Sequence, residues 1–223
     1  MPRIVLVGTP GSGKSTQMRI VAEKYGVVPI NVGDLLRAEV AKGTELGNPI
    51  KEAMDTPAAL VPDEIVAKLV EDRIKQPDCV EKGFVLRGYP RTKRQGELLD
   101  AAGIKIDACI NIDVPTADDV LQRVQDKFVD PETGNTYAGD AVRDLRDDVK
   151  ERLQRRADST REAIEARAEA CRQQAAEVRD FFGGAIFRTI DAAGKGIDAV
   201  KDGVDSALDS IPSVSVKLTV EVK

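Results

Sequence analysis

Short, wholly apolar runs alternate with longer stretches of mixed polarity along most of this chain. Residues 4–7 read Ile-Val-Leu-Val without a polar position, which is typical of a strand covered on both faces. The longer stretches carry apolar residues three or four positions apart, which indicates helices with one buried face. This alternation predicts an α/β fold in which helices cover both faces of a five-stranded parallel sheet. We expect strands at residues 3–7, 27–31, 83–86, 108–113 and 185–190, and helices at 14–25, 33–42, 48–55, 63–75, 93–102 and 117–127.

Three later segments depart from this alternation. Residues 128–142 contain Asp-Pro-Glu-Thr-Gly-Asn, which is turn chemistry and predicts a small flap outside the main sheet. Residues 143–182 are highly charged and predict one long helix or two in succession. Residues 214–222 alternate strictly between apolar and polar, so a C-terminal edge strand is expected within a tail at 211–223.

A glycine-rich segment follows the first apolar run. Residues 8–16 read Gly-Thr-Pro-Gly-Ser-Gly-Lys-Ser-Thr, which matches the pattern of a phosphate-binding loop between a strand and a helix. The glycines let backbone N–H groups point at one anion, and Lys14 adds a full positive charge. The hydroxyls of Ser15 and Thr16 are expected near a Mg²⁺ ion that enters with a nucleoside triphosphate. The segment therefore predicts triphosphate binding by Gly11, Ser12, Gly13, Lys14, Ser15 and Thr16, although kinases, GTPases and motor ATPases share such a loop.

Composition narrows the classes of function. The chain has 223 residues, a formal net charge of −5 and 42% hydrophobic residues, which fits one globular domain and argues against a general nucleic-acid or membrane-surface binder. It contains no histidine, so histidine acid–base chemistry and most zinc sites are excluded. Cys79, Cys109 and Cys171 have no metal or redox spacing and are expected to be free thiols. Because no signal-like segment precedes the first strand, we expect a cytoplasmic protein.

A group of further motifs resembles the adenylate kinase family of nucleoside monophosphate kinases. Residues 31–37 read Asn-Val-Gly-Asp-Leu-Leu-Arg, residues 60–64 read Leu-Val-Pro-Asp-Glu, and residues 83–92 read Gly-Phe-Val-Leu-Arg-Gly-Tyr-Pro-Arg-Thr, with Gln95 beyond them. The resemblance covers roughly residues 3 to 205. It implies a P-loop three-layer sandwich, a monomer, and Mg²⁺-dependent phosphoryl transfer from ATP to AMP that gives two ADP. It also implies one domain over residues 1–210, with a core (1–31, 62–126 and 160–210), an insert that binds the monophosphate (32–61) and a lid (127–159).

The resemblance assigns an acceptor site for AMP. Arg37 and Arg91 carry planar donors that can hold a phosphate with paired hydrogen bonds, and Gln95 offers a donor and an acceptor to the edge of adenine. Taken alone, Arg37 would suit an exposed helix position paired with Glu39 or Glu45. The full AMP-binding set implied by the family is Val32, Arg37, Ala59, Leu60, Val61, Gly88, Tyr89, Arg91, Gln95, Arg156 and Arg167.

The flap resembles the family's lid. Arg123 and Lys127 are four residues apart, which predicts that both lie on one helix face near the triphosphate, with Thr136 and Tyr137 near its base. Arg156 and Arg167 are eleven residues apart, so we expect them on one face of a long helix. The catalytic set implied is Lys14, Arg91, Arg123, Arg156 and Arg167. The remaining arginines are expected on solvated faces, namely Arg143, Arg146, Arg152, Arg155, Arg161 and Arg172, and the lid has no cysteine quartet for zinc.

Two residues depart from the family's pattern. Arg87 stands where the family has an aspartate that orders water around Mg²⁺, so we expect Asp34 to take over with Ser15, and reduced but real kinase activity. Val32 stands where adenylate kinases commonly have threonine, and a small apolar residue there is found in UMP/CMP kinases. Those enzymes tend to have asparagine where Gln95 stands, so AMP is the expected acceptor. A pyrimidine monophosphate kinase and a nucleotide-binding module without catalysis remain the alternatives.

Overall fold

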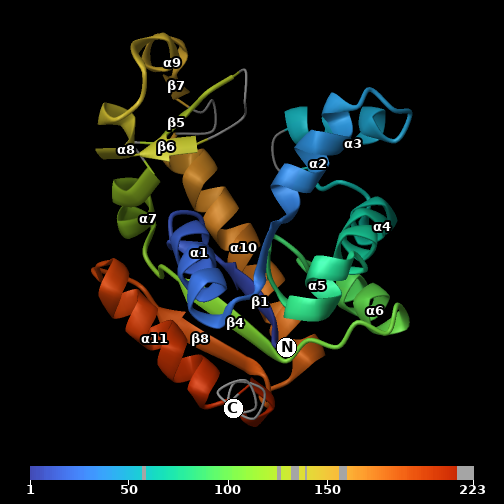
Figure 1. Cartoon of the computed structure of the whole chain (residues 1–223). Helices are drawn as coiled ribbons and strands as arrows, with labels where there is room; N and C mark the ends of the chain where they lie inside the picture. The colour runs from blue at the N-terminus through green and yellow to red at the C-terminus, as the bar shows by residue number, and fades with distance from the viewer. Residues whose placement is uncertain (57–58, 125–126, 132–135, 139, 156–159, 215–223) are drawn as a thin grey trace.

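Five parallel strands form the central sheet of the computed structural model, which describes residues 1–56, 59–124, 127–131, 136–138, 140–155 and 160–214 (Figure 1). The strand order is β2-β3-β1-β4-β8, and every neighbouring pair is parallel. The bounds are β1 Arg3–Gly8, β2 Val28–Asn31, β3 Phe84–Arg87, β4 Ala108–Asp113 and β8 Phe187–Asp191. The predicted fold class is confirmed, and each predicted strand lies within two residues of its observed bounds.

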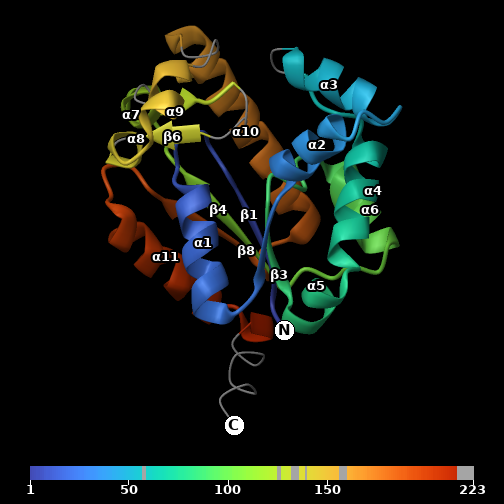
Figure 2. The ribbon, with the colours of Figure 1, turned by 45° about the horizontal axis from the view of Figure 1, so that its top comes forward.

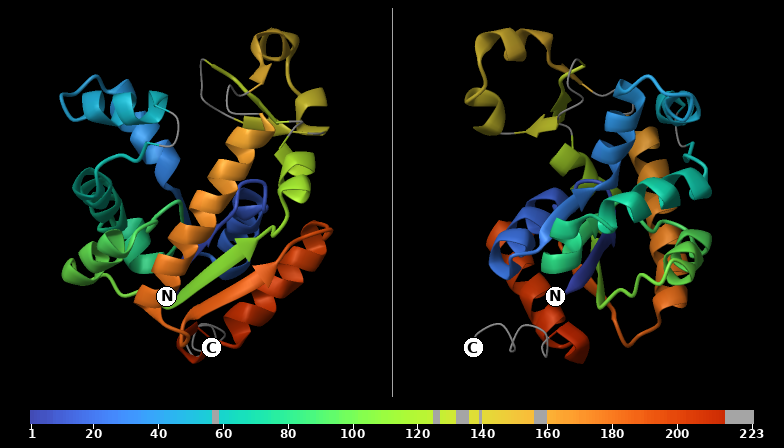
Figure 3. Two further views of the ribbon diagram at one scale, coloured as in Figure 1. Left: turned by 180° about the vertical axis from the view of Figure 1, so that it is seen from behind. Right: turned by 45° about the vertical axis from the view of Figure 1, so that its right-hand side comes forward.

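Helices cover both faces of this sheet (Figure 3). One face carries α1 (Lys14–Tyr25) and α11 (Ile197–Asp209), whose buried Val200, Val204 and Leu208 recur at helical spacing and join the core there. The other face carries α4 (Asp63–Ile74), α6 (Lys93–Ala101) and the 22-residue α10 (Arg161–Phe182). Two connecting helices complete the core, α5 (Pro77–Lys82) and α7 (Ala117–Val124). The sequence analysis did not predict α5 or α11.

Two groups of outer elements stand on opposite sides beyond the carboxyl ends of the core strands (Figures 1 and 2). Helices α2 (Val32–Ala41) and α3 (Gly47–Asp55) follow β2 directly, as predicted. The second group is a three-stranded antiparallel sheet, ordered β6-β5-β7, with short helices beside it. Its members are β5 Lys127–Val129, β6 Thr136–Ala138, α8 Asp140–Arg143, α9 Asp147–Arg152 and β7 Gln154–Arg155.

Several predictions in this second group were wrong. Helix α7 ends at Val124 and Lys127 opens β5, so Arg123 and Lys127 do not share a helix face. The charged segment is divided by β7, and α10 begins only at Arg161, where the Thr160 hydroxyl accepts a hydrogen bond from the backbone N–H of Ala163. Long-range strand pairing therefore prevailed over the local preference of a charged sequence for helix.

Arg156 lies outside the described residues, so the prediction that it shares a helix face with Arg167 stays a prediction. The edge strand predicted at 214–222 lies outside the described residues except for Val214, which lies in a short helical turn. All three cysteines fall within the described part of the chain and are free, as expected. Across the described residues, no helix has the length and apolarity needed to cross a membrane.

Candidate active site

The glycine-rich loop leaves β1 against the neighbouring strand β4. Gly8 has φ 131°, and a Cβ on it would lie 1.9 Å from the carbonyl oxygen of Ile112, so only glycine fits at this exit. Gly11 and Gly13 also have positive φ values, 75° and 91°, which curl the chain into the start of α1. The buried Thr9 hydroxyl accepts a hydrogen bond of 2.9 Å from the backbone N–H of Val114. The start of the loop is therefore anchored to the core at β4.

Lys14 is the charged group of this loop. Its ammonium donates to the carbonyl of Gly8 at 2.9 Å, to the carbonyl of Thr9 and to the hydroxyl of Ser12 at 3.2 Å. These contacts hold the positive charge over the concave side of the loop, at the N-terminal end of α1. Backbone N–H groups, the helix dipole and the ammonium therefore act together on any anion that enters.

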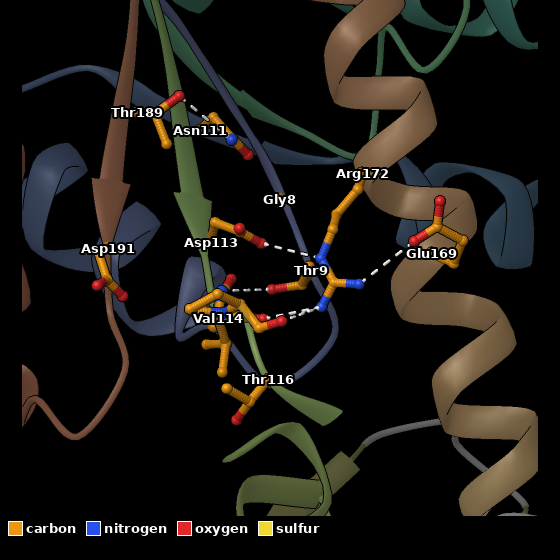
Figure 4. Close-up of polar contacts among 12 residues, drawn as sticks. Gly8, Thr9, Asn111, Asp113, Val114, Thr116, Glu169, Arg172, Thr189 and Asp191 are labelled. Atoms are coloured by element: carbon orange, nitrogen blue, oxygen red, sulfur yellow. Dashed lines mark hydrogen bonds and ion pairs between the residues drawn. The ribbon is translucent and has the colours of Figure 1, made fainter. Parts of the chain in front are cut away.

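The connection after β4 ties the loop to α10 (Figure 4). Arg172 of α10 donates to the carbonyl of Pro115 at 2.7 Å and to that of Val114 at 3.3 Å, and its Nε lies 4.0 Å from Asp113. Arg172 was predicted to lie on a solvated face, and that prediction was wrong. The guanidinium satisfies carbonyls that would otherwise end the strand without partners, so it is a structural bridge from α10 to the loop's anchor.

A small pocket opens beside the loop, between α1 and the start of α11. It is lined by Ser12, Gly13, Thr16, Gln17, Arg123, Lys195, Gly196, Ile197 and Val200. Arg123 donates to the carbonyls of Ala192 and Lys195, the latter at 3.0 Å, and the buried Gln17 donates to the carbonyl of Ile197 at 3.1 Å. The sequence analysis expected Arg123 near the triphosphate and did not single out residues 195–197. The glycines around Lys195, directly after a strand, were the available signal of a turn at this edge.

A second polar cluster lies at the carboxyl end of β3, two strands from the loop's anchor on β4. Gln95 is buried, and its Nε2 donates to Asp63 at 2.7 Å while its Oε1 accepts from the backbone N–H of Arg91 at 2.7 Å. The Thr92 hydroxyl donates to the other oxygen of Asp63 at 3.0 Å and caps α6. Asp63 was read from the sequence only as the start of α4. It is the residue that holds Gln95 and Thr92 in place.

The chain between β3 and α6 passes close to this cluster. Tyr89 is buried, its hydroxyl donates to the carbonyl of Gln95 at 3.0 Å, and burial raises its pKa well above the usual value. Arg91 folds back so that its Nε donates to the carbonyl of Gly88 at 3.0 Å. A Cβ on Gly88 would lie 3.6 Å from Arg91 and 3.9 Å from Val32, so the guanidinium and the start of α2 flank the same turn.

Arginines gather around this turn. Arg37 of α2 forms an ion pair with Asp34, not with the Glu39 or Glu45 that the sequence offered, and the second oxygen of Asp34 accepts from Asn31 at 2.8 Å. Arg87, the last residue of β3, is half-buried. Burial lowers the pKa of Arg87; the Asp34 carboxylate opposes this effect, and Arg91 and Arg37 add to it. The charges that act on Arg87 are therefore those of Asp34 and of the two arginines that the family pattern assigns to the acceptor phosphate.

The comparisons with known proteins agree with this geometry. The family model described as adenylate kinase matches residues 6–183. An adenylate kinase of Coxiella burnetii (strain RSA 493 / Nine Mile phase I) is 40% identical over 184 residues, which are 81% of this chain and 78% of that protein. A probable chloroplastic adenylate kinase 2 of Oryza sativa subsp. japonica is 42% identical over 166 residues, which are 74% of this chain and 56% of that protein.

The chain belongs to the adenylate kinase family. It is therefore a nucleoside monophosphate kinase, and nucleotide binding follows from membership. The family pattern assigns three further residues to the acceptor site, and they lie in the segment between α3 and α4. Leu60 is exposed and Val61 is buried, directly before α4, and Ala59 is exposed beside them.

The lid residues of the family pattern are described only in part. Tyr137 is half-buried in β6, and Lys127 and Thr136 begin β5 and β6. Arg167 lies half-buried on α10. Arg152, predicted to be solvated, instead donates to both oxygens of the fully buried Asp130 at 2.8 and 2.7 Å, and that prediction was wrong. This bidentate pair joins α9 to the end of β5 and stabilises the small sheet.

Magnesium enters such a site with the nucleotide. Within the described residues, no group of three or more acidic or sulfur side chains is placed to hold a metal ion. The exposed Ser15 hydroxyl lies at the start of α1, and Asp34 keeps both oxygens engaged with Arg37 and Asn31. This donor set fits an ion whose ligands are mostly phosphate oxygens and water, with one or two protein groups. It does not provide a cage made by the protein alone.

Proposed function

We propose that this enzyme transfers a phosphoryl group from ATP to AMP and forms two ADP. One observation carries the proposal: the Lys14 loop, the turn with Arg91 and the helix with Arg37 follow three adjacent parallel strands, β1, β3 and β2. In open parallel sheets, ligands bind at the carboxyl ends of the strands. Two anion-binding groups at one such edge suit a donor and an acceptor phosphate that meet end to end.

Each residue then has a physical task. Phosphoryl transfer needs alignment and charge neutralisation more than covalent assistance. The loop and Lys14 hold the donor phosphates, while Arg37 and Arg91 hold the acceptor phosphate with forked donors. Ser15 and Asp34 are the residues that would face a Mg²⁺ ion bound with ATP, which would supply positive charge to the donor phosphates. Arg123, Arg156 and Arg167 are proposed to neutralise the migrating group.

The domain limits also belong to this proposal. Residues 32–61 would close over the acceptor and residues 127–159 over the donor, which would exclude water from the reacting phosphates. Lys127, Thr136 and Tyr137 would contact the donor nucleotide from the lid. That the enzyme is monomeric and cytoplasmic and has no nucleic-acid partner stays a prediction.

Gln95 supports AMP as the acceptor. After its bonds to Asp63 and Arg91, its amide keeps one N–H and one oxygen lone pair, which match the donor and acceptor edge of adenine. One observation favours the pyrimidine alternative: Val32 is buried and apolar, so the base there meets no hydroxyl.

A coupled assay with ATP and Mg²⁺ and with AMP, CMP, UMP or GMP in parallel tests the proposal. We expect AMP to give the highest kcat/KM. Faster turnover of CMP or UMP would support the pyrimidine alternative. Nucleotide binding without ADP formation from any acceptor would instead support a module without catalysis.

A further inference from the structure

Arg87 is the side chain that the proposed chemistry leaves without a task. It ends β3, where the parallel register places it beside Leu6 of β1 and Asn31 of β2. The glycine-rich loop begins two residues after Leu6, and α2 begins directly after Asn31. Arg87 therefore stands between the strands that lead to the donor and acceptor phosphate groups.

The charges around Arg87 do not balance. The guanidinium groups of Arg37 and Arg91 both act on that of Arg87, and Asp34 is the carboxylate that acts on it. Both oxygens of Asp34 are already engaged, one by Arg37 and one by Asn31. Among the described residues, Arg87 forms no hydrogen bond or ion pair through its side chain. A half-buried guanidinium in this setting lacks the anion that normally accompanies it.

We propose that Arg87 is a third guanidinium ligand of the acceptor phosphate, which it binds as a phosphate monoester dianion without the help of a metal ion. This inference rests on the proposed function for the identity of the acceptor. A guanidinium fork matches two phosphate oxygens, which an ammonium group does not. The acceptor side is chosen over the donor side because the charges acting on Arg87 belong to Arg37, Arg91 and Asp34 rather than to Lys14.

The consequence is a change of two charge units at one position relative to the family's aspartate. The acceptor phosphate gains an attractive partner, and the site loses a carboxylate that could order water around Mg²⁺. We therefore expect tight AMP binding in the absence of a metal, together with a lower kcat than an aspartate at this position would give.

Calorimetric binding of AMP in EDTA, without ATP, tests the assignment. We expect Arg87→Gln to weaken AMP about tenfold, which corresponds to about 1.4 kcal/mol, and Arg87→Lys to recover only part of the loss. Adenosine, which lacks the phosphate, should bind both proteins equally. The matched control is Arg94→Gln, because Arg94 is an exposed arginine on α6 that contacts only Glu64 and Glu97 across 3.4 and 3.9 Å.

Unchanged AMP affinity in Arg87→Gln, or an equal loss for adenosine, would overturn the proposal. A loss confined to ATP would move Arg87 to the donor side and would also overturn it. Thermal unfolding with and without inorganic phosphate gives a second readout: phosphate should raise the Tm of the natural protein more than that of Arg87→Gln. These measurements need no turnover. They can therefore support the role of Arg87 even if the coupled assay detects no ADP formation, and the coupled assay can support the proposed function even if Arg87 does not bind AMP.

Arg87→Asp adds a kinetic readout. With saturating Mg²⁺, the variant is expected to show a higher KM for AMP together with a higher kcat and a steeper dependence on Mg²⁺. A purely structural role of Arg87 would not move KM and kcat in the same direction. Unchanged rate and unchanged Mg²⁺ dependence would contradict this part of the inference.

Discussion

The two regions that we propose to bind phosphate are built in different ways. The loop at Lys14 depends on backbone geometry, since Gly8 packs against Ile112 and Thr9 is held by Val114 in the core. The acceptor side depends on side chains, because Arg37 and Arg91 reach the site through exposed or half-buried contacts. A region fixed by backbone tolerates few substitutions. A region made of side-chain charges can change its charge by single substitutions, and Arg87 is such a change.

Loss of the loop's charge should have the largest effect. Lys14→Met keeps the length of the side chain and the glycine geometry but removes the ammonium that acts on the transferred group. We expect kcat to fall about 10³-fold with little change in Tm. Steady-state kinetics with ATP and AMP measure the effect, and Lys68→Met, at an exposed lysine on α4, is the control. A loss below tenfold would show that the loop's N–H groups suffice.

The acceptor side should respond through KM rather than through folding. Arg91→Lys keeps the charge but removes the fork, so kcat/KM for AMP should fall by roughly tenfold to a hundredfold while ATP binding stays unchanged. Arg94→Lys, three residues further on α6, serves as the matched control. If the affinity for ATP falls together with kcat/KM for AMP, Arg91 acts on both nucleotides. The Lys14 loop and the acceptor side would then be less separate than proposed.

The loop was predictable from sequence because its chemistry is local. Nine consecutive residues carry the glycines, the lysine and the hydroxyls, and an apolar strand precedes them. The core strands were predictable for a similar reason, since burial on both faces removes polar residues from a short run. The predicted roles of Arg37 and Arg91 came from the order of the family's motifs, because the residues next to each arginine in sequence do not by themselves indicate a phosphate site.

The long-range contacts that hold the acceptor site and the small antiparallel sheet were not predictable, because they join residues far apart in sequence. Asp63 and Gln95 are separated by 32 positions, and Asp130 and Arg152 by 22. Spacing alone favoured a shared helix face for Arg123 and Lys127, yet α7 ends at Val124 and Lys127 pairs with Ala138 in the small sheet. Helix α11 could have been found, since Val200, Val204 and Leu208 recur every four residues.

Gln95 tests how much the buried hydrogen bonds beside the acceptor site contribute to the stability of the fold. Gln95→Leu leaves an oxygen of Asp63 and the backbone N–H of Arg91 without their present partners in a largely buried setting. We expect the free energy of unfolding to fall by about 2 kcal/mol and KM for AMP to rise. Urea unfolding measures the first effect. Gln173→Leu, at an exposed glutamine on α10, controls for the exchange itself, and an equal loss in both variants would contradict the structural role.

The smallest expected effect is on stability, from an ion pair between α1 and α11, the two helices that cover one face of the sheet. Asp205 of α11 pairs with Lys24 of α1 at 2.9 Å and with Lys201 at 3.2 Å. Burial by itself raises the pKa of Asp205, but the hydrogen bonds from the two lysines outweigh it, so the pKa lies below its usual value of 3.8. A carboxyl whose pKa is lowered on folding stabilises the protein above its unfolded pKa, and this stabilisation is lost as the pH falls through the folded value.

Asp205→Asn should therefore lower the free energy of unfolding by about 1 kcal/mol at pH 7, and the difference from the natural protein should shrink as the pH falls below 3.8 and through the lowered folded pKa. Urea unfolding at a series of pH values measures both quantities. Asp202→Asn removes the same charge from an exposed position on the same helix, with one contact of 3.4 Å to Lys201, and should show almost no pH-dependent difference. Because α1 carries Lys14 at its other end, a fall in kcat with the Asp205 substitution would mean that the loop also depends on this distant ion pair. Unchanged kcat would show that the loop's own hydrogen bonds and its contacts with Ile112 and Val114 hold it without this distant ion pair.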